Sequence, residues 1–459
     1  MITDLSHFSK VFANLPDGVA WAEINADSRK DMEISVKGGK QSGCESLERT
    51  ILYLRASDGA KTGTVYTELL DEDPERLIKT AINNAAYMDT SFDVQPNKNS
   101  NIHLGCVEQG AEMPELLSFA LELEAEVKSR SESVGIIDCK VRRTEQHRRV
   151  MNSLGMDNTL DHQFYIANLG VSRPCSTGMT LSASARACSV RLQDIDIKSL
   201  AGKLLKKLDR MDMGGTLGKT AVKSGIYDCV LSSDVVCNIL LTSWQEFSAK
   251  NMTTGKSVFS PAQGVQVGSY CLSITDAPSH ADWGYYLALD SEGTVCEAKS
   301  IVKDGLLVTP LHTLASAGAG MQPPTGNAGR AALLTGTVPV NIVTIPSIFY
   351  IEPGLATEDE LTGQMRNGIL LTYSIDEFHS INIASGEFSI PCGGIVYDNN
   401  KPVGIVDQIS IAGNLRDLFI NIQAVGNDMQ FNEFDYKNYC YGGPCMLVKN
   451  LYISSAANG

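Results

Sequence analysis

The segment at 368–428 constrains the fold more than any other stretch, because its β-prone runs and turn residues follow one another in a definite order. Two β-prone runs, at 395–397 and 403–406, flank a cluster of turn-forming residues and so predict a β-hairpin. Alternating apolar and polar side chains then continue the second run as a strand with one buried face. Asn414 is next placed to cap a short amphipathic helix, which we expect to end at Gly426.

The order of strand-like and helical runs predicts an α+β protein of two domains. Strand-like runs fill residues 19–66, helical patterns follow, and strand-like runs return at 135–189. This grouping favours α+β over alternating β/α units, and 459 residues are too many for one ordinary core. We therefore predict an N-terminal mixed α/β domain with an antiparallel sheet at 1–222, and a β-rich C-terminal domain at 223–459.

Capping residues and apolar spacing predict the helices. Asp73 is a capping acceptor, and Pro74 after it suits the first helical position. Further helices are expected to begin near Pro114, to cover about 196–211, and to run from a serine cap over 233–250.

The rest of the chain is predicted to consist of short strands and loops. The glycine-rich stretch at 214–218 is interpreted as the linker between the domains, and 310–330 as a surface loop. Strand-like runs are expected at 269–274, 283–289, 338–345 and 368–373.

The charge of the chain is strongly acidic. Asp and Glu number 53 and Lys and Arg 38, which gives a net charge of −15. Such a surface repels a phosphate backbone unless basic residues are segregated, so we expect no direct contact with nucleic acid. The one basic cluster is interpreted as solvated side chains on the edge of a strand, and it consists of Arg142, Arg143, Arg148 and Arg149.

Cysteine usage and the lack of long apolar runs predict a soluble, cytoplasmic protein. The 12 cysteines have no framework spacing, as is typical of reduced thiols. The N-terminal residues lack the pattern of a secretory signal, and no run of about twenty apolar residues occurs. No membrane partner is therefore expected.

Several short motifs carry a resemblance to a known family. They are Ser-Gly-Glu-Phe at 385–388, Gly393-Gly394, Ile-Ala-Gly-Asn-Leu-Arg-Asp at 411–417 and Ala-Val-Gly-Asn-Asp at 424–428. Thr-Gly-Asn-Ala-Gly-Arg at 325–330 and two N-terminal runs, at 36–39 and 54–55, extend the similarity over nearly the whole chain. Together they resemble the TldD/TldE (PmbA) peptidase-like family, which was earlier named after a proposed modulation of DNA gyrase.

The resemblance also directs attention to a zinc motif. Members of the TldD branch resemble zinc metallopeptidases with a His-Glu-x-x-x-His helix, in which the histidines hold the metal and the glutamate activates its water. By resemblance, the ligand positions fall at Thr242 and Phe247, and the general-base position at Ser243. Phe247 has no donor atom and Thr242 is a poor zinc ligand. The chain is thus more similar to the TldE/PmbA branch, which lacks the motif, and we expect no catalytic residue and no cofactor in it.

Membership of that branch implies a partner. The resemblance implies a non-catalytic subunit that pairs with a TldD-type zinc metallopeptidase in the processing or degradation of unfolded peptides. Zinc is then expected only in the TldD-type subunit, and the chain is expected to form a heterodimer with it or a homodimer with itself.

Extended peptides are the expected ligands, because an accessible strand edge can bind a peptide as an added strand. Glycines allow close approach of such a backbone, although turn geometry alone would also account for them. The residues that we expect to line a groove for the peptide are Thr325, Gly326, Asn327, Arg330, Gly393 and Gly394.

Two other functions stay open from the sequence. The first is an active metallopeptidase whose metal site is assembled from distant residues, for which Cys440 with Cys445 and His280 with Asp282 are partial ligand pairs. The second is a regulator associated with DNA gyrase, as the older family name suggests.

Overall fold

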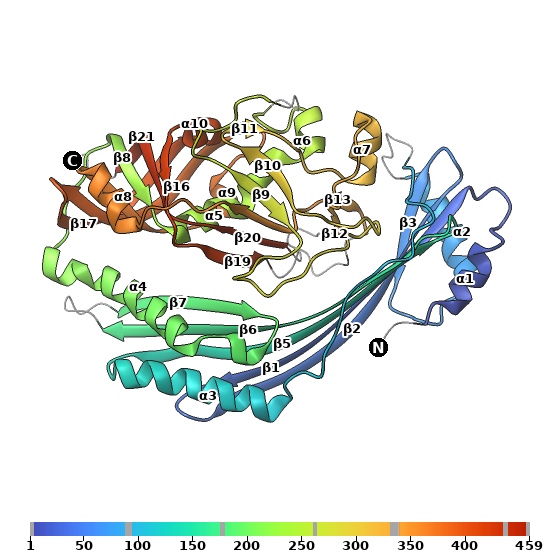
Figure 1. Ribbon diagram of the computed structural model, residues 1–459, viewed down its shortest axis with the longest axis horizontal. Helices are drawn as coiled ribbons and strands as arrows, with labels where there is room; N and C mark the ends of the chain where they lie inside the picture. The colour runs from blue at the N-terminus through green and yellow to red at the C-terminus, as the bar shows by residue number, and fades with distance from the viewer. Residues whose placement is uncertain are drawn as a thin grey trace.

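The protein consists of a long, curved N-terminal sheet and a C-terminal unit that lies on the concave side of this sheet (Figure 1). The computed structural model describes residues 4–455 except 88–93, 175–179, 260–263, 331–337, 339 and 435–438. Several antiparallel sheets are combined with helices along the chain, which confirms the α+β fold class.

The N-terminal sheet has seven strands in the order β3-β2-β1-β5-β6-β4, and β7 pairs with a separate stretch of β6. Strands β1 and β2 pair with each other along nearly their whole length, and β1 pairs equally far with β5. The strands are β1 (Trp21–Val36), β2 (Gln41–Ser57), β3 (Thr62–Thr67), β4 (His103–Gly105), β5 (Gly135–Asn152), β6 (Asp157–Pro174) and β7 (Thr180–Ser189).

Helices cover the opposite face of this sheet (Figure 1). Helix α3 (Met113–Arg130) packs on β1 and β5, and α4 (Ile197–Leu217) packs on β7 in the same apolar core. A short 3-10 turn, η1 (Leu192–Asp194), precedes α4.

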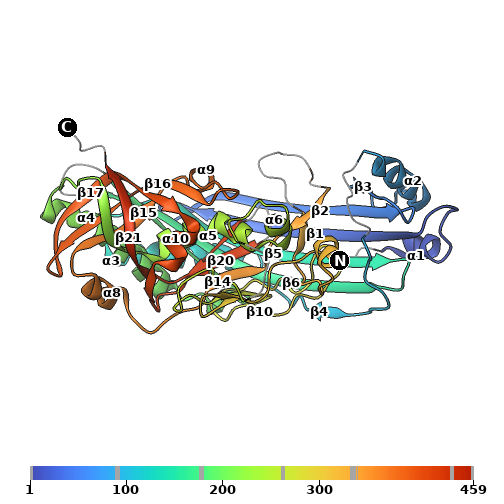
Figure 2. The ribbon, with the colours of Figure 1, turned by 90° about the horizontal axis from the view of Figure 1, so that it is seen from above.

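At the far end of the sheet, α1 (Ser6–Phe12) and α2 (Pro74–Ala85) form a second small core with β2 and β3 (Figure 2). The predicted cap of α2 is confirmed, because the Asp73 side chain accepts a hydrogen bond from the Glu75 amide at 3.1 Å. None of the helices in the described ranges has both the length and the apolar character that crossing a membrane requires.

A closed ring of five strands forms one half of the C-terminal unit. Its order is β17-β16-β15-β8-β21, pairing between β17 and β21 closes it, and β18 extends from β21. The β16–β17 pair confirms the hairpin predicted around 395–406. The strands are β8 (Gly225–Leu231), β15 (Gly368–Ser374), β16 (Glu387–Asp398), β17 (Lys401–Asn414), β18 (Ile422–Val425) and β21 (Met446–Ser455).

A second sheet completes the unit, in the order β11-β10-β9-β14-β20-β19, beside the two-stranded β12–β13. Its strands are β9 (Ile274–Ala277), β10 (Lys299–Lys303), β11 (Leu306–Leu307), β12 (Ala328–Arg330), β13 (Ile342–Thr344), β14 (Ile348–Ile351), β19 (Gln430–Phe434) and β20 (Tyr439–Gly443). The helices are α5 (Ser233–Ser243), the 3-10 turn η2 (Trp244–Phe247), α6 (Ala249–Thr253), α7 (Leu314–Gly320), α8 (Glu358–Met365), α9 (Glu377–Ser380) and α10 (Leu415–Ile420).

Three predicted helix boundaries are wrong, and packing explains two of them. The helix at 233–250 ends at Ser243 and tightens into η2, a change of pitch that buries both Trp244 and Phe247. Asn414 caps α10 as predicted, but the helix ends at Ile420 because 422–425 pair with β21 as a strand. The third difference is that α4 continues through the glycines of 214–218 as far as Leu217, so this stretch is largely helix rather than linker.

Other segments also differ from the prediction. The stretch 310–330 is not one loop, since it contains α7, capped by Thr313, and the short strand β12. Residues 283–289 form no strand, because their backbone contacts the N-terminal sheet instead: the Gly284 amide donates to the Cys188 carbonyl oxygen at 3.2 Å.

Candidate functional site

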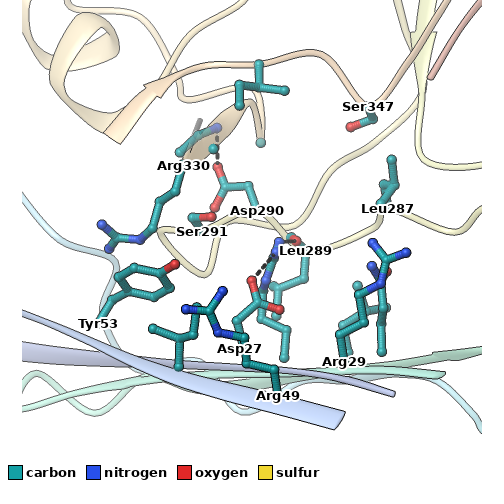
Figure 3. Close-up of a pocket in the computed structure, with 18 of the residues that line it drawn as sticks. Asp27, Arg29, Arg49, Tyr53, Leu287, Leu289, Asp290, Ser291, Arg330 and Ser347 are labelled. Carbon is teal, nitrogen blue, oxygen red and sulfur yellow. Dashed lines mark hydrogen bonds and ion pairs between the residues drawn. The ribbon is translucent and has the colours of Figure 1, made fainter. Parts of the chain in front are cut away.

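A cavity of about 480 Å³ lies between the N-terminal sheet and the C-terminal unit. Its floor is the face of β1, β2 and β5, and its roof comes from segments at 287–291, 326–330 and 345–347 (Figure 3). This volume is within the range of small-ligand sites. Side chains two residues apart on a strand share one face, which is why the floor collects the charged residues Asp27, Arg29, Asp31, Arg49, Arg142 and Arg148.

Ion pairs hold the charged floor in place. Arg148 Nη2 lies 2.6 Å from Asp27 Oδ2, and Arg29 Nε lies 2.8 Å from Asp31 Oδ2. Arg148 also donates through Nη1 to the Leu289 carbonyl oxygen at 2.9 Å. The floor is therefore fixed both within the sheet and against the roof.

Arg330 reaches from β12 in the roof to the floor (Figure 3). Its guanidinium lies 4.3 Å from the centre of the Tyr53 ring, a cation–π contact, and Nη1 donates to the Val340 carbonyl oxygen. Its Nε and Nη2 are buried and have no hydrogen-bond partner among the described residues. Burial, followed by the charge of Arg55, lowers the pKa of Arg330 to about 10. Burial and then Asp27 raise the pKa of Tyr53 to about 12.

Asp290 organises the loop beside Arg330. Its Oδ1 accepts from the Glu292 and Thr294 amides at 2.8 and 2.9 Å, and its Oδ2 accepts from the Ala328 amide at 3.0 Å. Burial, and after it the charge of Glu292, raise the pKa of Asp290 to about 7. Because three amides occupy its oxygens, this carboxyl group serves to position the roof.

A buried triad behind the cavity ties the two units together. Arg55 on β2 contacts Glu23 Oε1 at 2.7 Å and Glu292 Oε1 at 2.6 Å, and all three side chains are at most 5% exposed. Glu292 also accepts from the Leu314 amide at 2.8 Å. Burial alone would lower the pKa of Arg55, but the charges of Glu23 and Glu292 outweigh it and raise that pKa.

The composition of the cavity is suited to binding polar groups. The described residues that line it include five arginines, three aspartates and one tyrosine, but no histidine, cysteine or lysine. Guanidinium and carboxylate groups are suited to bind the polar groups of a ligand.

Part of the predicted peptide-binding set lies at this cavity. Gly326 and Arg330 line it. Asn327 is buried just behind the wall, where Nδ2 donates to Asp276 Oδ2 at 2.8 Å and to the Ile345 carbonyl oxygen at 3.1 Å. Thr325 Oγ1 donates to Asn327 Oδ1 at 2.7 Å. Thr325 and Asn327 therefore brace the wall that presents the other two residues.

Gly393 and Gly394 lie elsewhere, in β16 of the closed ring. A Cβ atom at Gly394 would come within 2.0 Å of the Leu370 carbonyl oxygen, and one at Gly393 within 2.4 Å of the Tyr373 hydroxyl oxygen. These close approaches account for both glycines through packing between β15 and β16. The structure does not bring them to the cavity beside Gly326 and Arg330, and their contact with peptide stays a prediction.

The positions of the zinc motif are filled by an apolar core. Thr242, Ser243 and Phe247 are all buried, with Phe247 fully so. The Phe247 ring centre lies 5.5 Å from that of Phe259, 5.8 Å from that of Phe349 and 6.2 Å from that of Phe419. Three rings thus surround the position that carries an imidazole ligand in a zinc helix, and this donor set does not fit zinc.

One carboxyl group is buried next to this aromatic cluster. Glu246 is fully buried, and its Oε2 accepts from the Val258 amide at 2.8 Å. Burial is the main cause that raises the pKa of Glu246 to about 7. Its Oε1 has no hydrogen-bond partner in the described part of the chain.

The partial ligand pairs seen in the sequence also have structural partners. Cys440 and Cys445 are both buried, and Cys440 accepts from Trp283 Nε1 at 3.2 Å. The His280 ring packs on Tyr350 and Phe431. Within the described ranges, no three His, Cys, Asp or Glu side chains are grouped so that they could hold a metal ion.

The basic cluster was interpreted wrongly. Strand β5 lies inside the sheet between β1 and β6, so its arginines do not lie on an edge. Arg142 and Arg148 line the cavity, Arg143 is 7% exposed, and Arg149 pairs with Asp157 at 2.8 Å. Arg142 and Arg148 lie an even number of positions apart on one strand. Because side chains alternate between the two faces, this separation already indicates that both lie on the same face.

The C-terminal unit is the part of the chain for which a comparison with known protein families finds a peptidase-related match. Residues 224–455, half of the chain, match the family model described as PmbA/TldA metallopeptidase C-terminal domain. The chain therefore belongs to the TldD/PmbA family.

Relatives extend this likeness over the whole chain. A protein of Methanothermobacter thermautotrophicus named Metalloprotease is 22% identical over 497 residues, with 99% of both chains covered. A solved structure from Thermotoga maritima that carries the name modulator of a DNA gyrase has a TM-score of 0.77 at 21% identity, over 98% of each chain. TldE from Thermococcus kodakarensis has a TM-score of 0.79 at 15% identity, over 98% of this chain and 100% of that one.

Proposed function

We propose that this protein is a non-catalytic, TldE-like subunit that binds extended peptides and assembles with a TldD-type zinc metallopeptidase. The observation that carries this proposal is the aromatic cluster around Phe247, which occupies the position of a metal ligand. A zinc site needs nitrogen, sulfur or carboxylate donors around an open space. Here the corresponding space contains four packed phenyl rings.

The interdomain cavity supports the binding half of the proposal. It combines apolar walls, such as Leu287 and Ile345, with charged groups, and its described lining contains no histidine, cysteine or lysine. Such a surface can hold a peptide while a partner subunit performs the cleavage. The proposed assembly is a heterodimer, with a homodimer of this chain as the alternative.

The proposed place of action is the cytoplasm. Eleven cysteines in the described part of the chain are free, and eight of them are buried. Burial raises the pKa of several of these thiols, for instance that of Cys139 to about 12, which keeps them protonated and unreactive. Free thiols are typical of reducing compartments.

The test is metal analysis combined with peptide cleavage. The chain, purified without chelator, should hold far less than stoichiometric zinc and should leave an unstructured peptide intact. Added to a TldD-type subunit, it should co-elute with that subunit and increase cleavage. Stoichiometric zinc together with cleavage by the isolated chain would contradict the proposal and would favour an active metallopeptidase.

A further inference from the structure

We propose that residues 43–51 of β2 form an open sheet edge that binds an extended peptide as an added strand, next to the interdomain cavity. This inference deepens the proposed peptide-binding function and rests on it for the class of ligand. The name open edge is used below for residues 43–51 alone.

The edge is open because β3 is much shorter than β2. Strand β2 pairs with β1 on its inner side from Gln41 to Ser57. On its outer side β3 covers only 52–57. For 43–51, the described chain provides neither a strand nor a side chain that bonds to the outward amides and carbonyls. About half of the backbone groups in this stretch therefore point away from the sheet.

The open edge carries the charged residues Glu45, Glu48 and Arg49, but it lacks two other features that usually protect such a strand. Long exposed edges attract other strands, and proteins commonly interrupt them with proline or a bulge. Residues 43–51 contain no proline, and pairing with β1 becomes irregular only beyond them, where Val36 faces Gln41. Leu47 in the middle of the edge is 60% exposed. The stretch is thus a regular and accessible template for one more strand.

The cavity borders the same strand, and its size favours a narrow ligand such as a single extended peptide. Leu47, Arg49, Ile51 and Tyr53 alternate along β2 and all line the cavity, so an added strand would direct every second side chain to this side. Arg330 in the roof lies over the ring of Tyr53, the last residue of this row (Figure 3). A volume of about 480 Å³ accommodates several side chains but not a folded domain.

The contacts offered to a peptide are mainly backbone hydrogen bonds, so binding should depend weakly on sequence. Arg49 is the exception on the edge, because its side chain is 48% exposed and its one ion pair among the described residues is with the equally accessible Glu68. Exposed pairs of this kind are weak, which leaves the Arg49 guanidinium available for a carboxylate of the peptide. Unfolded chains are the ligands that such a surface fits.

Hydrogen–deuterium exchange of the full chain tests the inference directly. The probe is an unstructured peptide of roughly ten residues, long enough to cover the open edge at about 3.3 Å per residue. It should slow exchange of the outward amides within 43–51 by about tenfold or more. Residues 52–57 of the same strand already pair with β3 and provide an internal control that should not change.

Two matched variants separate backbone pairing from other binding. Two peptides with the same side chains carry N-methyl groups on alternate amides, one on the odd and one on the even positions. The peptide whose methylated amides would face β2 should bind at least about tenfold more weakly than the unmethylated peptide. The amides of Ser46 and Leu47 point to opposite sides of β2, and the matched protein variant replaces the one whose amide points away from β1 with proline. This variant should abolish the protection of residues 43–51 from exchange by the peptide. Its unfolding temperature should stay unchanged, because no hydrogen bond to β1 is lost. Arg76→Gln, on an exposed helix outside the cavity, should bind like the wild type.

The other outcomes distinguish this inference from the proposed function. Protection at a different strand would overturn the open-edge inference and leave peptide binding standing. Protection of 43–51 without peptide, rising with protein concentration, would show a second copy there and overturn it as well. Absence of any peptide binding would overturn both. If the isolated chain held stoichiometric zinc and cleaved peptide while residues 43–51 were still protected, the proposed non-catalytic role would be wrong but the open-edge inference would stand.

Discussion

The aromatic cluster around Phe247 and the interdomain cavity are two regions of one molecule that differ in what fills them. Around Phe247, phenyl rings pack with centres about 6 Å apart and the neighbouring side chains are buried. The cavity keeps about 480 Å³ open above a floor of paired arginines and aspartates. The first region contains the positions that the sequence resemblance aligns with a zinc motif, and the second lies between the two structural units.

The difference shows how one chain combines a tightly filled core with a cavity that stays open. An apolar cluster stabilises the fold through burial and needs no ligand. An open charged cavity contributes less to packing, so a ligand can enter without displacing a core. The comparison can be tested with variants that disturb each region, and the four that follow are ordered by the size of the expected effect.

The largest effect is expected behind the cavity. Arg55→Gln should lower the free energy of unfolding by roughly 4 to 5 kcal/mol, because Glu23 and Glu292 would stay buried without a counter-ion. Urea denaturation measures this change. Arg49→Gln is the control, since its partner Glu68 is half exposed and the pair is screened by solvent. If both variants lost the same free energy of unfolding, the buried triad would contribute no more to stability than an exposed ion pair.

The aromatic cluster should respond almost as strongly. Phe247→Ala should cost roughly 3 to 4 kcal/mol, since the fully buried ring leaves a cavity among its neighbours. Phe247→Leu keeps most of the volume and should cost clearly less. Both are measured by urea denaturation. A stable Phe247→Ala protein would mean that the region is loosely packed, and the contrast with the cavity would disappear.

The charge buried beside the cluster predicts a dependence on pH. The pKa of Glu246 is raised by burial from 4.5 to about 7, so the native state holds this proton more tightly than the unfolded chain does. The associated stability is fully present below about pH 4.5 and is lost as the pH rises through 7, by about 3 kcal/mol. Unfolding measured at a series of pH values should show this loss in the wild type.

Glu246→Gln removes the titrating group and should flatten this part of the curve. Glu48→Gln, on the exposed stretch of β2, is the matched control and should leave the pH dependence unchanged. If Glu246→Gln kept the full slope, the loss would belong to another buried acid, for which Asp290 beside the cavity is the next candidate.

The smallest effect is expected at the cap of α10. Asn414 Oδ1 accepts from the Arg416 amide at 3.0 Å, and α10 carries Phe419 into the aromatic cluster. Asn414→Ala should therefore cost about 1 kcal/mol, and Asn414→Ser, which keeps an acceptor for the Arg416 amide, should cost less. Thermal unfolding detects the difference. A loss as large as that of Phe247→Ala would indicate that α10 holds the whole cluster in place.

Local signals in the sequence predicted local structure well. Asp73 and Asn414 are caps whose partners lie two residues away, and both hydrogen bonds form as expected. The hairpin at 395–406 follows from turn residues between β-prone runs. The expectation that position 247 holds no zinc rests on side-chain chemistry alone, because phenylalanine has no donor atom, and it stays a prediction.

The cavity could not be predicted in the same way. Arg55 meets Glu292 across 237 positions of sequence, and nothing near either residue indicates the other. The arginines of β5 were misjudged because strand order decides whether a strand is an edge, and that order depends on pairing between distant segments. Thr325–Arg330 was a recognisable motif, yet only the structure separates the residues that face the cavity from those that brace its wall.

The closed ring of strands has a consequence for how the protein is made. Strand β8 pairs with β21, which lies roughly 220 residues later in the chain, and β21 also joins β17 to shut the ring. During synthesis β8 therefore cannot pair with β21 until most of the C-terminal unit has been produced. Contacts of such long sequence separation slow folding and leave apolar strands unprotected in the meantime. We expect the nascent chain to depend on chaperones until β21 has emerged from the ribosome.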